Sequence, residues 1–348
     1  MVGHAGPVAL SRPARQLDED DVRVRPGRGS RPRTRRRPAH EDAAEAFVTA
    51  VDRGRYTCVV EGRGAAGQEI TAMRARELGR KSVVVGDTVS LVGDASGDRG
   101  TLARIVRVAP RRSVLRRSAD DTDPVERVIV ANAEQLGIVT ALADPPPRLR
   151  LIDRFLVAAY DAGLDPLLLL TKADLAGPDE ILAAYRPLGV RYLVTGRPLA
   201  EDVLDELRRL LADRVSVLVG HSGVGKSTLV NALIPEASRA VGPVSPVTGR
   251  GRHTSSSVVA LRLPGGGWII DTPGLRSFGL GHISAGRVAQ AFPDLAGGLA
   301  GCPPGCAHLG TDCALDAWVS EHDQGGALAA RLDSLRRLLR SHEGRDDG

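Results

Sequence analysis

The stretch Gly220–Ser227 constrains the fold of this chain more than any other. It reads G-H-S-G-V-G-K-S and lies between the apolar run Val215–Val219 and a helix-like stretch that begins at Thr228. A G-x-x-x-x-G-K-S pattern between a strand and a helix is typical of a phosphate-binding loop, whereas an ordinary glycine-rich turn is the alternative. The pattern therefore predicts a nucleoside triphosphate site.

Each residue type in this loop has a chemical reason to be there. The glycines let backbone N–H groups curl around phosphate oxygens, Lys226 places a positive charge near the β- and γ-phosphates, and Ser227 can ligate Mg²⁺. The residues predicted to bind the nucleotide here are Gly220, His221, Ser222, Gly223, Val224, Gly225, Lys226, Ser227 and Thr228.

Length and composition indicate a globular protein of two or three domains, since the chain has 348 residues. It contains no apolar run of the ~20 residues that span a bilayer and no apolar signal core, so we expect a soluble, cytoplasmic protein. The chain has a net charge of +5, and the excess of positive charge lies in residues 1–40, which hold ten Arg against four acidic residues. We expect a disordered tail at 1–42, which either captures a polyanion such as RNA or is a solvated extension.

Residues 43–117 show short β-type runs separated by glycines and polar turns. The runs are Arg55–Val60, Gln68–Ala72, Val83–Leu91 and Gly100–Val108. About 70 residues with four or five strands suit an OB-fold barrel, which often binds single-stranded nucleic acid, although an SH3-like module has the same periodicity.

Residues 125–281 alternate strands with helices, which predicts a parallel sheet covered on both faces. We expect strands at 135–140, 166–170, 190–194, 215–219, 258–263 and 268–270, and helices at 150–162, 179–185 and 200–211. Because chemistry in such sheets gathers at the carboxyl ends of strands, we expect the motifs to meet there.

Thr171-Lys172-Ala173-Asp174 follows one of these strands and has the T/N-K-x-D guanine pattern. Guanine offers an N1–H and N2–H₂ donor pair that one carboxylate accepts, so Asp174 is the predicted base selector, with Lys172 along the base plane. Thr171 replaces an Asn whose amide would brace neighbouring loops. Thr195, after the next strand, stands where backbone N–H groups meet the base oxygen. The chain uses Arg almost everywhere, since only three of its 47 Lys and Arg residues are Lys. Two of these three, Lys172 and Lys226, lie in the nucleotide motifs. This is expected, because a planar guanidinium cannot replace a compact ammonium among phosphates.

Two further segments have the pattern of nucleotide switches. The polar segment 242–257 contains His253 and Thr254, and the hydroxyl of Thr254, or of Ser255, can complete the Mg²⁺ shell. A D-T-P-G motif then supplies Asp271 for Mg²⁺ and the N–H of Gly274 for the γ-phosphate. The full set of motifs favours a GTPase over a P-loop kinase.

The order of these motifs is unusual, because the base motifs precede the phosphate loop. The sheet of an ordinary GTPase must therefore have been cut and rejoined, which predicts a circularly permuted P-loop GTPase domain. Leu275 follows D-T-P-G, where Ras-like enzymes carry a water-orienting Gln. We expect slow intrinsic hydrolysis, with the water oriented by His253 or by a partner.

The last region, 282–342, holds three cysteines and a histidine within twelve residues. Cys302, Cys306, His308 and Cys313 suit one structural zinc ion in a small, mostly helical domain, with a disulfide as the alternative. Ala327–Leu339 has leucines at helical spacing and predicts an amphipathic helix that packs on the zinc region.

These residues together resemble the small ribosomal subunit biogenesis GTPase (RsgA, or YjeQ) family over roughly residues 43–340. The likeness covers the OB-fold, the permuted order of T-K-x-D, G-x-S-G-V-G-K-S, G-x-x-x-H-T and D-T-P-G, and the order Cys, Cys, His, Cys. The chain departs from the family in its long tail, in His-Thr-Ser-Ser where a longer Thr run is usual, and in a compact zinc spacing.

The resemblance implies a monomeric GTP hydrolase that binds the 30S subunit and its 16S rRNA late in assembly and is stimulated by it. GTP, Mg²⁺ and one Zn²⁺ are the implied cofactors, and no membrane is involved. A GTP-dependent RNA-binding scaffold, whose output is occupancy rather than turnover, is the alternative.

Overall fold

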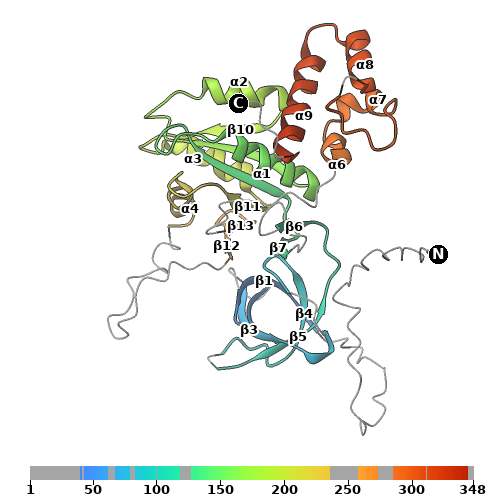
Figure 1. The fold of residues 1–348 in the computed structure, drawn as a ribbon. Helices are drawn as coiled ribbons and strands as arrows, with labels where there is room; N and C mark the ends of the chain where they lie inside the picture. The colour runs from blue at the N-terminus through green and yellow to red at the C-terminus, as the bar shows by residue number, and fades with distance from the viewer. Residues whose placement is uncertain are drawn as a thin grey trace, which may run out of the picture.

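The computed structural model describes residues 40, 43–61, 67–78, 83–98, 100–117, 127–235, 258–272, 285–310 and 312–343. The expected tail at 1–42 lies, apart from residue 40, outside this part of the chain. Figure 1 shows three regions in a row: a barrel coloured blue at one end, an α/β layer in the centre, and orange to red helices at the other end.

The barrel has five strands whose order closes on itself. They are β1 (Ala44–Asp52), β2 (Arg55–Val60), β3 (Gln68–Arg74), β4 (Thr88–Gly93) and β5 (Ala103–Val108), with the short 3₁₀ helix η2 (Arg76–Leu78) after β3. The strands pair in the order β1-β2-β3-β5-β4, and β4 pairs back onto β1. Among the described strands of the barrel, only β3 and β5 run parallel to each other. This closed five-stranded barrel confirms the OB-like prediction and excludes the SH3-like alternative.

Most barrel strands differ from the prediction in their boundaries, since β3 extends to Arg74 and β5 begins at Ala103 rather than at Gly100. The run Val83–Leu91 is not one strand, because β4 begins only at Thr88. Gly86 has a φ of 91°, and the carboxylate of Asp87 turns back to accept the N–H of Val84 at 2.8 Å. The strand β1 has no counterpart in the prediction, and a bulge interrupts its pairing with β2.

A polar junction joins the barrel to the rest of the chain. The buried Asp87 carboxylate accepts two hydrogen bonds from Arg111, at 2.8 and 2.9 Å. Asn132 accepts the N–H of Arg112 and donates to the carbonyl of Gly86. A two-stranded ribbon leads away from this junction, formed by β6 (Val114–Arg117) and β7 (Arg127–Ala131). Because the polar partners are buried, the junction is a fixed connection rather than a loose linker.

The central sheet has the predicted parallel arrangement. Its strands are β8 (Gln135–Ala141), β9 (Asp165–Thr171), β10 (Arg191–Val194), β11 (Val215–Val219), β12 (Val259–Arg262) and β13 (Trp268–Asp271). They pair in the order β10-β9-β8-β11-β13-β12, and only β12 is antiparallel to its neighbour. The direction of winding reverses between β8 and β11, which is where such sheets bind ligands.

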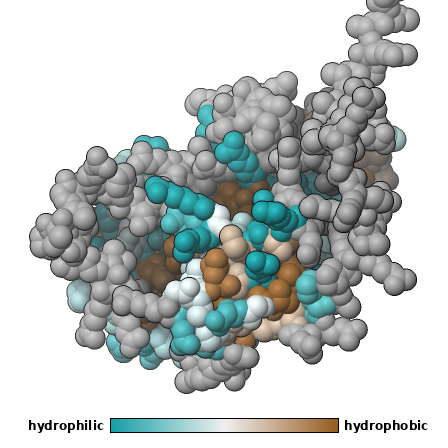
Figure 2. Space-filling model, turned by 90° about the horizontal axis from the view of Figure 1, so that it is seen from below, coloured by the Kyte–Doolittle hydropathy of each residue, from teal (hydrophilic) through white to brown (hydrophobic). Residues whose placement is uncertain are grey.

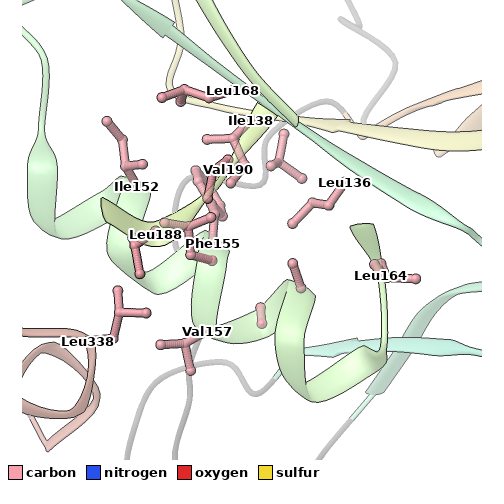
Figure 3. Packing of buried hydrophobic residues seen from close by; sticks show 14 of the residues in the cluster. Leu136, Ile138, Ile152, Phe155, Val157, Leu164, Leu168, Leu188, Val190 and Leu338 are labelled. Carbon is pink, nitrogen blue, oxygen red and sulfur yellow. The ribbon is translucent and has the colours of Figure 1, made fainter. Parts of the chain in front are cut away.

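Helices cover both faces of this sheet. The buried face of α1 (Leu149–Ala162) packs against β8 and β9, with α2 (Asp179–Tyr185) and the 3₁₀ helix η3 (Arg186–Leu188) beside it. Figure 3 shows Ile152 and Phe155 of α1 directed toward Ile138 and Leu168 of the sheet. The opposite face is covered by α3 (Glu201–Leu211) and α4 (Lys226–Leu233). Burial on both faces explains why the central strands read as continuous apolar runs.

The C-terminal region is helical. It consists of α6 (Ala285–Gln290), the 3₁₀ helix η4 (Pro293–Leu295), α7 (Ala296–Leu299), α8 (Ala314–His322) and α9 (Ala327–Glu343). The predicted leucine stripe of α9 is buried at Leu332, Leu335, Leu338 and Leu339. This stripe packs on α8, as expected, but it also packs on α1, and Figure 3 shows Leu338 close to the α1 cluster. The helix therefore joins the C-terminal region to the central sheet.

The barrel and the central sheet also meet directly. Strand β12 pairs with β1 through Val259 and Ala50, so one continuous sheet runs through both regions. The rings of Phe47 and Trp268 stack beside this pairing with centroids 4.9 Å apart. Within the described part of the chain, the helices are all too short or too polar to cross a bilayer.

Replacement of Gly86 by Ala should destabilise the protein, because a Cβ there would lie 2.0 Å from the carbonyl oxygen of Ala131. Gly54 is a matched control, with a φ of 83° and nothing within 4 Å of its Cβ position. We expect Gly86→Ala to cost about 2–4 kcal/mol and Gly54→Ala about 1 kcal/mol. Thermal unfolding of both variants measures the difference, and equal shifts in Tm would contradict it.

Candidate nucleotide site and metal cluster

The phosphate loop lies between the end of β11 and the start of α4. Its backbone turns through positive φ angles of 148° at Gly220, 81° at Gly223 and 98° at Gly225. A Cβ at Gly220 would lie 2.2 Å from the carbonyl oxygen of Val139, so the loop approaches β8 in a way that only glycine permits. Gly225 immediately precedes α4, whose N-terminal N–H groups attract anions.

Lys226 extends back over the loop that precedes it. Its ammonium donates to the carbonyl oxygens of Gly220, at 2.6 Å, and His221, at 3.0 Å. Burial lowers the pKa of Lys226, and the negative charge of Asp271 opposes that shift. The ammonium therefore lies at the mouth of the loop, where its positive charge would attract a bound phosphate.

Asp271, at the end of β13, has a half-buried carboxylate near this ammonium. Burial raises the pKa of Asp271, while the charge of Lys226 lowers it. Among the described residues, no donor reaches its Oδ1 atom. The next residue, Thr272, donates its hydroxyl to the carbonyl of Leu218 at 2.8 Å and so ties the end of β13 to β11. A buried carboxylate oxygen without a donor fits a magnesium-bound water, so the donor set suits a metal-bound triphosphate.

The guanine motif lies beside the phosphate loop at the carboxyl end of β9. The hydroxyl of Thr171 donates to the carbonyl oxygen of Val224, within the phosphate loop, at 2.5 Å. Thr171 lacks the amide of an Asn, but its hydroxyl still braces the phosphate loop. Lys172 has a φ of 60°, and its ammonium donates to the carbonyl of Asp144.

The loop after β10 holds the guanine motif from the other side. The backbone N–H of Ala173 donates to the carbonyl of Thr195 at 3.0 Å, and the N–H of Thr195 donates to Leu170 at 2.7 Å. Asp174 Oδ1 accepts the backbone N–H of Arg197 at 2.8 Å. Sequence reasoning passed over Arg197, although an arginine directly after the predicted base loop is a signal that could have identified it.

Four predicted residues lie outside the described part of the chain. They are His253, Thr254 and Gly274, together with Ser255 as the alternative magnesium ligand. Their proximity to the phosphate loop stays a prediction.

The four predicted metal ligands form a cluster between α7 and α8. The ligand atoms of Cys302, Cys306, His308 and Cys313 all lie within 4.8 Å of one another. The Sγ atom of Cys313 is 3.7 Å from both Cys302 Sγ and His308 Nδ1. All four cysteines of the chain are free thiols, so the structure does not support the disulfide alternative.

The surroundings of this cluster suit a bound cation. Burial, reinforced by the neighbouring Cys302, raises the pKa of Cys313 to about 11. Burial and the charge of Arg336 lower the pKa of His308, which favours the neutral imidazole that binds metals. Three thiols and one neutral imidazole are the donor set of a closed tetrahedral zinc site.

Arg336 connects this cluster to α9. Its guanidinium donates to the carbonyl of His308 at 3.2 Å and to both carboxylate oxygens of Asp316, at 2.8 and 2.7 Å. The ligand loop and α8 are thereby fastened to the long helix.

The phosphate loop and the D-x-x-G aspartate follow neighbouring parallel strands, and a guanine motif from an earlier part of the chain lies at the same edge of the sheet. This arrangement defines a circularly permuted P-loop GTPase. The family model described as RsgA GTPase matches residues 108–281. The chain belongs to the RsgA GTPase family, and it is a GTP hydrolase that uses GTP and Mg²⁺.

Similar proteins cover most of the chain. A protein from Pseudomonas aeruginosa named small ribosomal subunit biogenesis GTPase RsgA is 40% identical over 275 residues, which are 75% of this chain and 76% of that protein. A protein of the same name from Shewanella oneidensis is 39% identical over 271 residues, covering 75% of this chain and 74% of that protein.

Two solved structures share the fold. The crystal structure of YjeQ from Thermotoga maritima aligns with a TM-score of 0.63 at 23% identity, covering 87% of this chain and 99% of that chain. YloQ, described as a circularly permuted GTPase, aligns with a TM-score of 0.61 at 24% identity, covering 90% of this chain and 99% of that chain.

Replacement of Thr171 by Val should loosen the site, since it leaves the buried carbonyl of Val224 without its donor. We expect a loss of about 1–3 kcal/mol of stability and weaker GDP binding. Thr101→Val is the control, because the Thr101 hydroxyl makes a comparable bond to Asp98 at 2.7 Å on the surface. Thermal unfolding and calorimetric titration with GDP measure both effects, and an unchanged GDP affinity in Thr171→Val would argue against the brace.

Proposed function

We propose that this GTPase binds the small (30S) ribosomal subunit, acts in its late maturation, and is stimulated by it to hydrolyse GTP. The observation that carries this proposal is the 40% identity, over 75% of the chain, to a relative named for small ribosomal subunit biogenesis. The fold adds support, since a barrel and a metal cluster flank the GTPase sheet on opposite sides.

The proposed nucleotide roles follow the geometry of the sheet edge. Asp174 selects guanine, Lys172 lies along the base, and Thr195 belongs to the loop that meets the base oxygen. Lys226 and the backbone of the phosphate loop bind the β- and γ-phosphates. Ser227 and Asp271 would hold Mg²⁺, which would neutralise charge on the phosphates when bound.

The remaining catalytic roles are proposed for the switch segments. Thr254, or Ser255, completes the magnesium shell, and the N–H of Gly274 binds the γ-phosphate. His253 or the ribosomal subunit orients the attacking water, because Leu275 cannot hydrogen-bond it. Slow intrinsic turnover suits an enzyme whose partner decides when hydrolysis occurs.

We further propose that the barrel contacts RNA, including 16S rRNA. Arg55, Met73 and Arg104 are register partners across β2, β3 and β5 and are all exposed. Figure 2, which views the molecule from the barrel side, shows exposed hydrophobic residues with hydrophilic residues beside them. Cations beside apolar groups suit the phosphates and bases of RNA.

The proposed division of the chain has four parts. A tail occupies 1–42, the RNA-binding barrel 43–117, the permuted GTPase domain 125–281, and the metal-binding domain 282–342. We also propose that the protein acts as a monomer in the cytoplasm, where the ribosomal subunit is assembled.

The test is GTP turnover measured for the protein alone, with 30S particles, and with 50S particles. We expect 30S to stimulate turnover at least about tenfold, which corresponds to ~1.4 kcal/mol on the barrier, because the subunit supplies the water-orienting group. The control is Lys226→Ala, which should abolish nucleotide binding.

Three other outcomes of the turnover experiment would contradict parts of the proposal. GTP-dependent binding to 30S without stimulation would favour a scaffold whose output is occupancy. Equal stimulation by 50S would contradict specificity for the small subunit. Equal turnover of ATP would contradict the guanine-selecting role of Asp174.

We propose that Cys302, Cys306, His308 and Cys313 hold one structural zinc ion. Four protein donors leave no open position for catalysis. Because Arg336 fastens the cluster to α9, the ion would stabilise the C-terminal region and its contact with α1.

Removal of zinc should therefore destabilise the protein. The purified chain should contain one zinc per molecule, and Cys306→Ser should lower both the zinc content and the Tm, since the site loses a thiolate ligand. Cys58→Ala, which removes the thiol of the barrel, is the control and should leave the zinc content unchanged. Elemental analysis and thermal unfolding provide the readouts, and full zinc occupancy in Cys306→Ser would refute the assignment.

A further inference from the structure

Arg197 connects the two ends of the nucleotide site. Its backbone N–H donates to Asp174 Oδ1 at 2.8 Å, on the side of the base. Its guanidinium Nη2 donates to the hydroxyl of Thr228 at 3.1 Å, in the first turn of α4, on the side of the phosphates. Arg197 thus reaches from the base-selecting loop to the phosphate-binding helix.

The electrostatic environment of this guanidinium favours an anion. Within the described part of the chain, Arg197 has Thr228 as its only side-chain partner and forms no ion pair. It lies at the N-terminal turn of α4, which carries the positive end of the helix dipole. A positive charge at a helix N-terminus is unfavourable unless an anion binds beside it.

Two other arginines near the site do form ion pairs, unlike Arg197. Arg191, the first residue of the preceding strand β10, lies 3.6 Å from the carboxylate of Asp165. Arg208, on α3, is held by the carboxylates of Glu201 and Asp205. Arg197 instead rests on an exposed hydroxyl, which is a partner that a phosphate oxygen can displace.

We propose that Arg197 is a second cation of the nucleotide site, whose guanidinium binds the phosphate nearest the ribose while its backbone N–H orients Asp174. That phosphate lies between the base and the β-phosphate, as Arg197 lies between Asp174 and Thr228. GDP and GTP share this phosphate, so the contact stabilises both complexes. The inference rests on the proposed roles of Asp174 and the phosphate loop.

Substitution of the side chain separates the two roles of Arg197, because every replacement except proline keeps the backbone N–H. In the full chain, Arg197→Gln should weaken GDP binding about tenfold, which is ~1.4 kcal/mol, and should speed GDP release. Arg197→Lys should recover part of the affinity, since it restores the charge but not the planar fork.

Calorimetry with GDP and competition by guanosine provide the decisive comparison. Guanosine has no phosphate, so its binding should be the same in the wild-type protein and Arg197→Gln. The loss of GDP affinity should shrink as salt is raised, because exposed charges are screened. Arg191→Gln is the matched control and should bind GDP normally.

Several results would overturn the proposal. Unchanged GDP affinity in Arg197→Gln would remove the phosphate contact, and an equal loss for guanosine would assign the side chain to the base. A wild-type protein that binds ADP as tightly as GDP would instead refute the role of Asp174. In that case an equal loss of ADP and GDP affinity in Arg197→Gln would still support the phosphate contact.

Discussion

The parallel pairing of β8 with both β9 and β11 is the constraint on which the nucleotide site depends. Gln135–Ala141 pairs with Asp165–Thr171 on one side, and its first four residues pair with Ser216–Val219 on the other. All seven residues of β8 are buried, so neither neighbour can shift without exposing an apolar strand. This pairing fixes the guanine motif and the phosphate loop at one edge, and the Thr171 hydroxyl then joins them directly.

Circular permutation changes which parts of the chain follow the switch segments, while the sheet keeps its order. The segment that contains His253 and Thr254 leads into β12, which pairs with β1 of the barrel. The segment after Asp271 leads into α6 and the metal-binding region. Each predicted switch is therefore continuous with one flanking region, so a change of nucleotide state has a short covalent route to both.

Elements could be predicted from the sequence where the local residue pattern alone determines the structure. The strand Val215–Val219 and the helix Asp179–Tyr185 have the predicted bounds, because a buried apolar run and an acidic first turn are local signals. The turn at Gly86 was missed because its φ of 91° follows from a close approach to Ala131, 45 residues away in the chain, which no local pattern encodes.

The same limit applies to the nucleotide site. Phosphate-loop and guanine motifs are local patterns, so their residues could be named from the sequence. The brace from Thr171 to Val224 spans 53 residues, and the contact from Arg197 to Thr228 spans 31. Both depend on which loops the parallel sheet brings together, and they became visible only with the three-dimensional arrangement.

The helix α9 shows how the metal-binding region is tied to the guanine motif. Arg337 donates to the carbonyl of Ala184 at 2.9 Å, and Arg331 donates to that of Pro187 at 3.0 Å, so both arginines hold the end of α2 and the start of η3. Arg337 also lies 3.3 Å from the buried carboxylate of Asp153 on α1. Because the Asp153 carboxylate is buried, removal of Arg337 would leave it without its cation, which is costly, so the pair holds α9 against α1. Since α2 begins just after the guanine motif, α9 holds the metal cluster and the base-selecting loop in one mechanical unit.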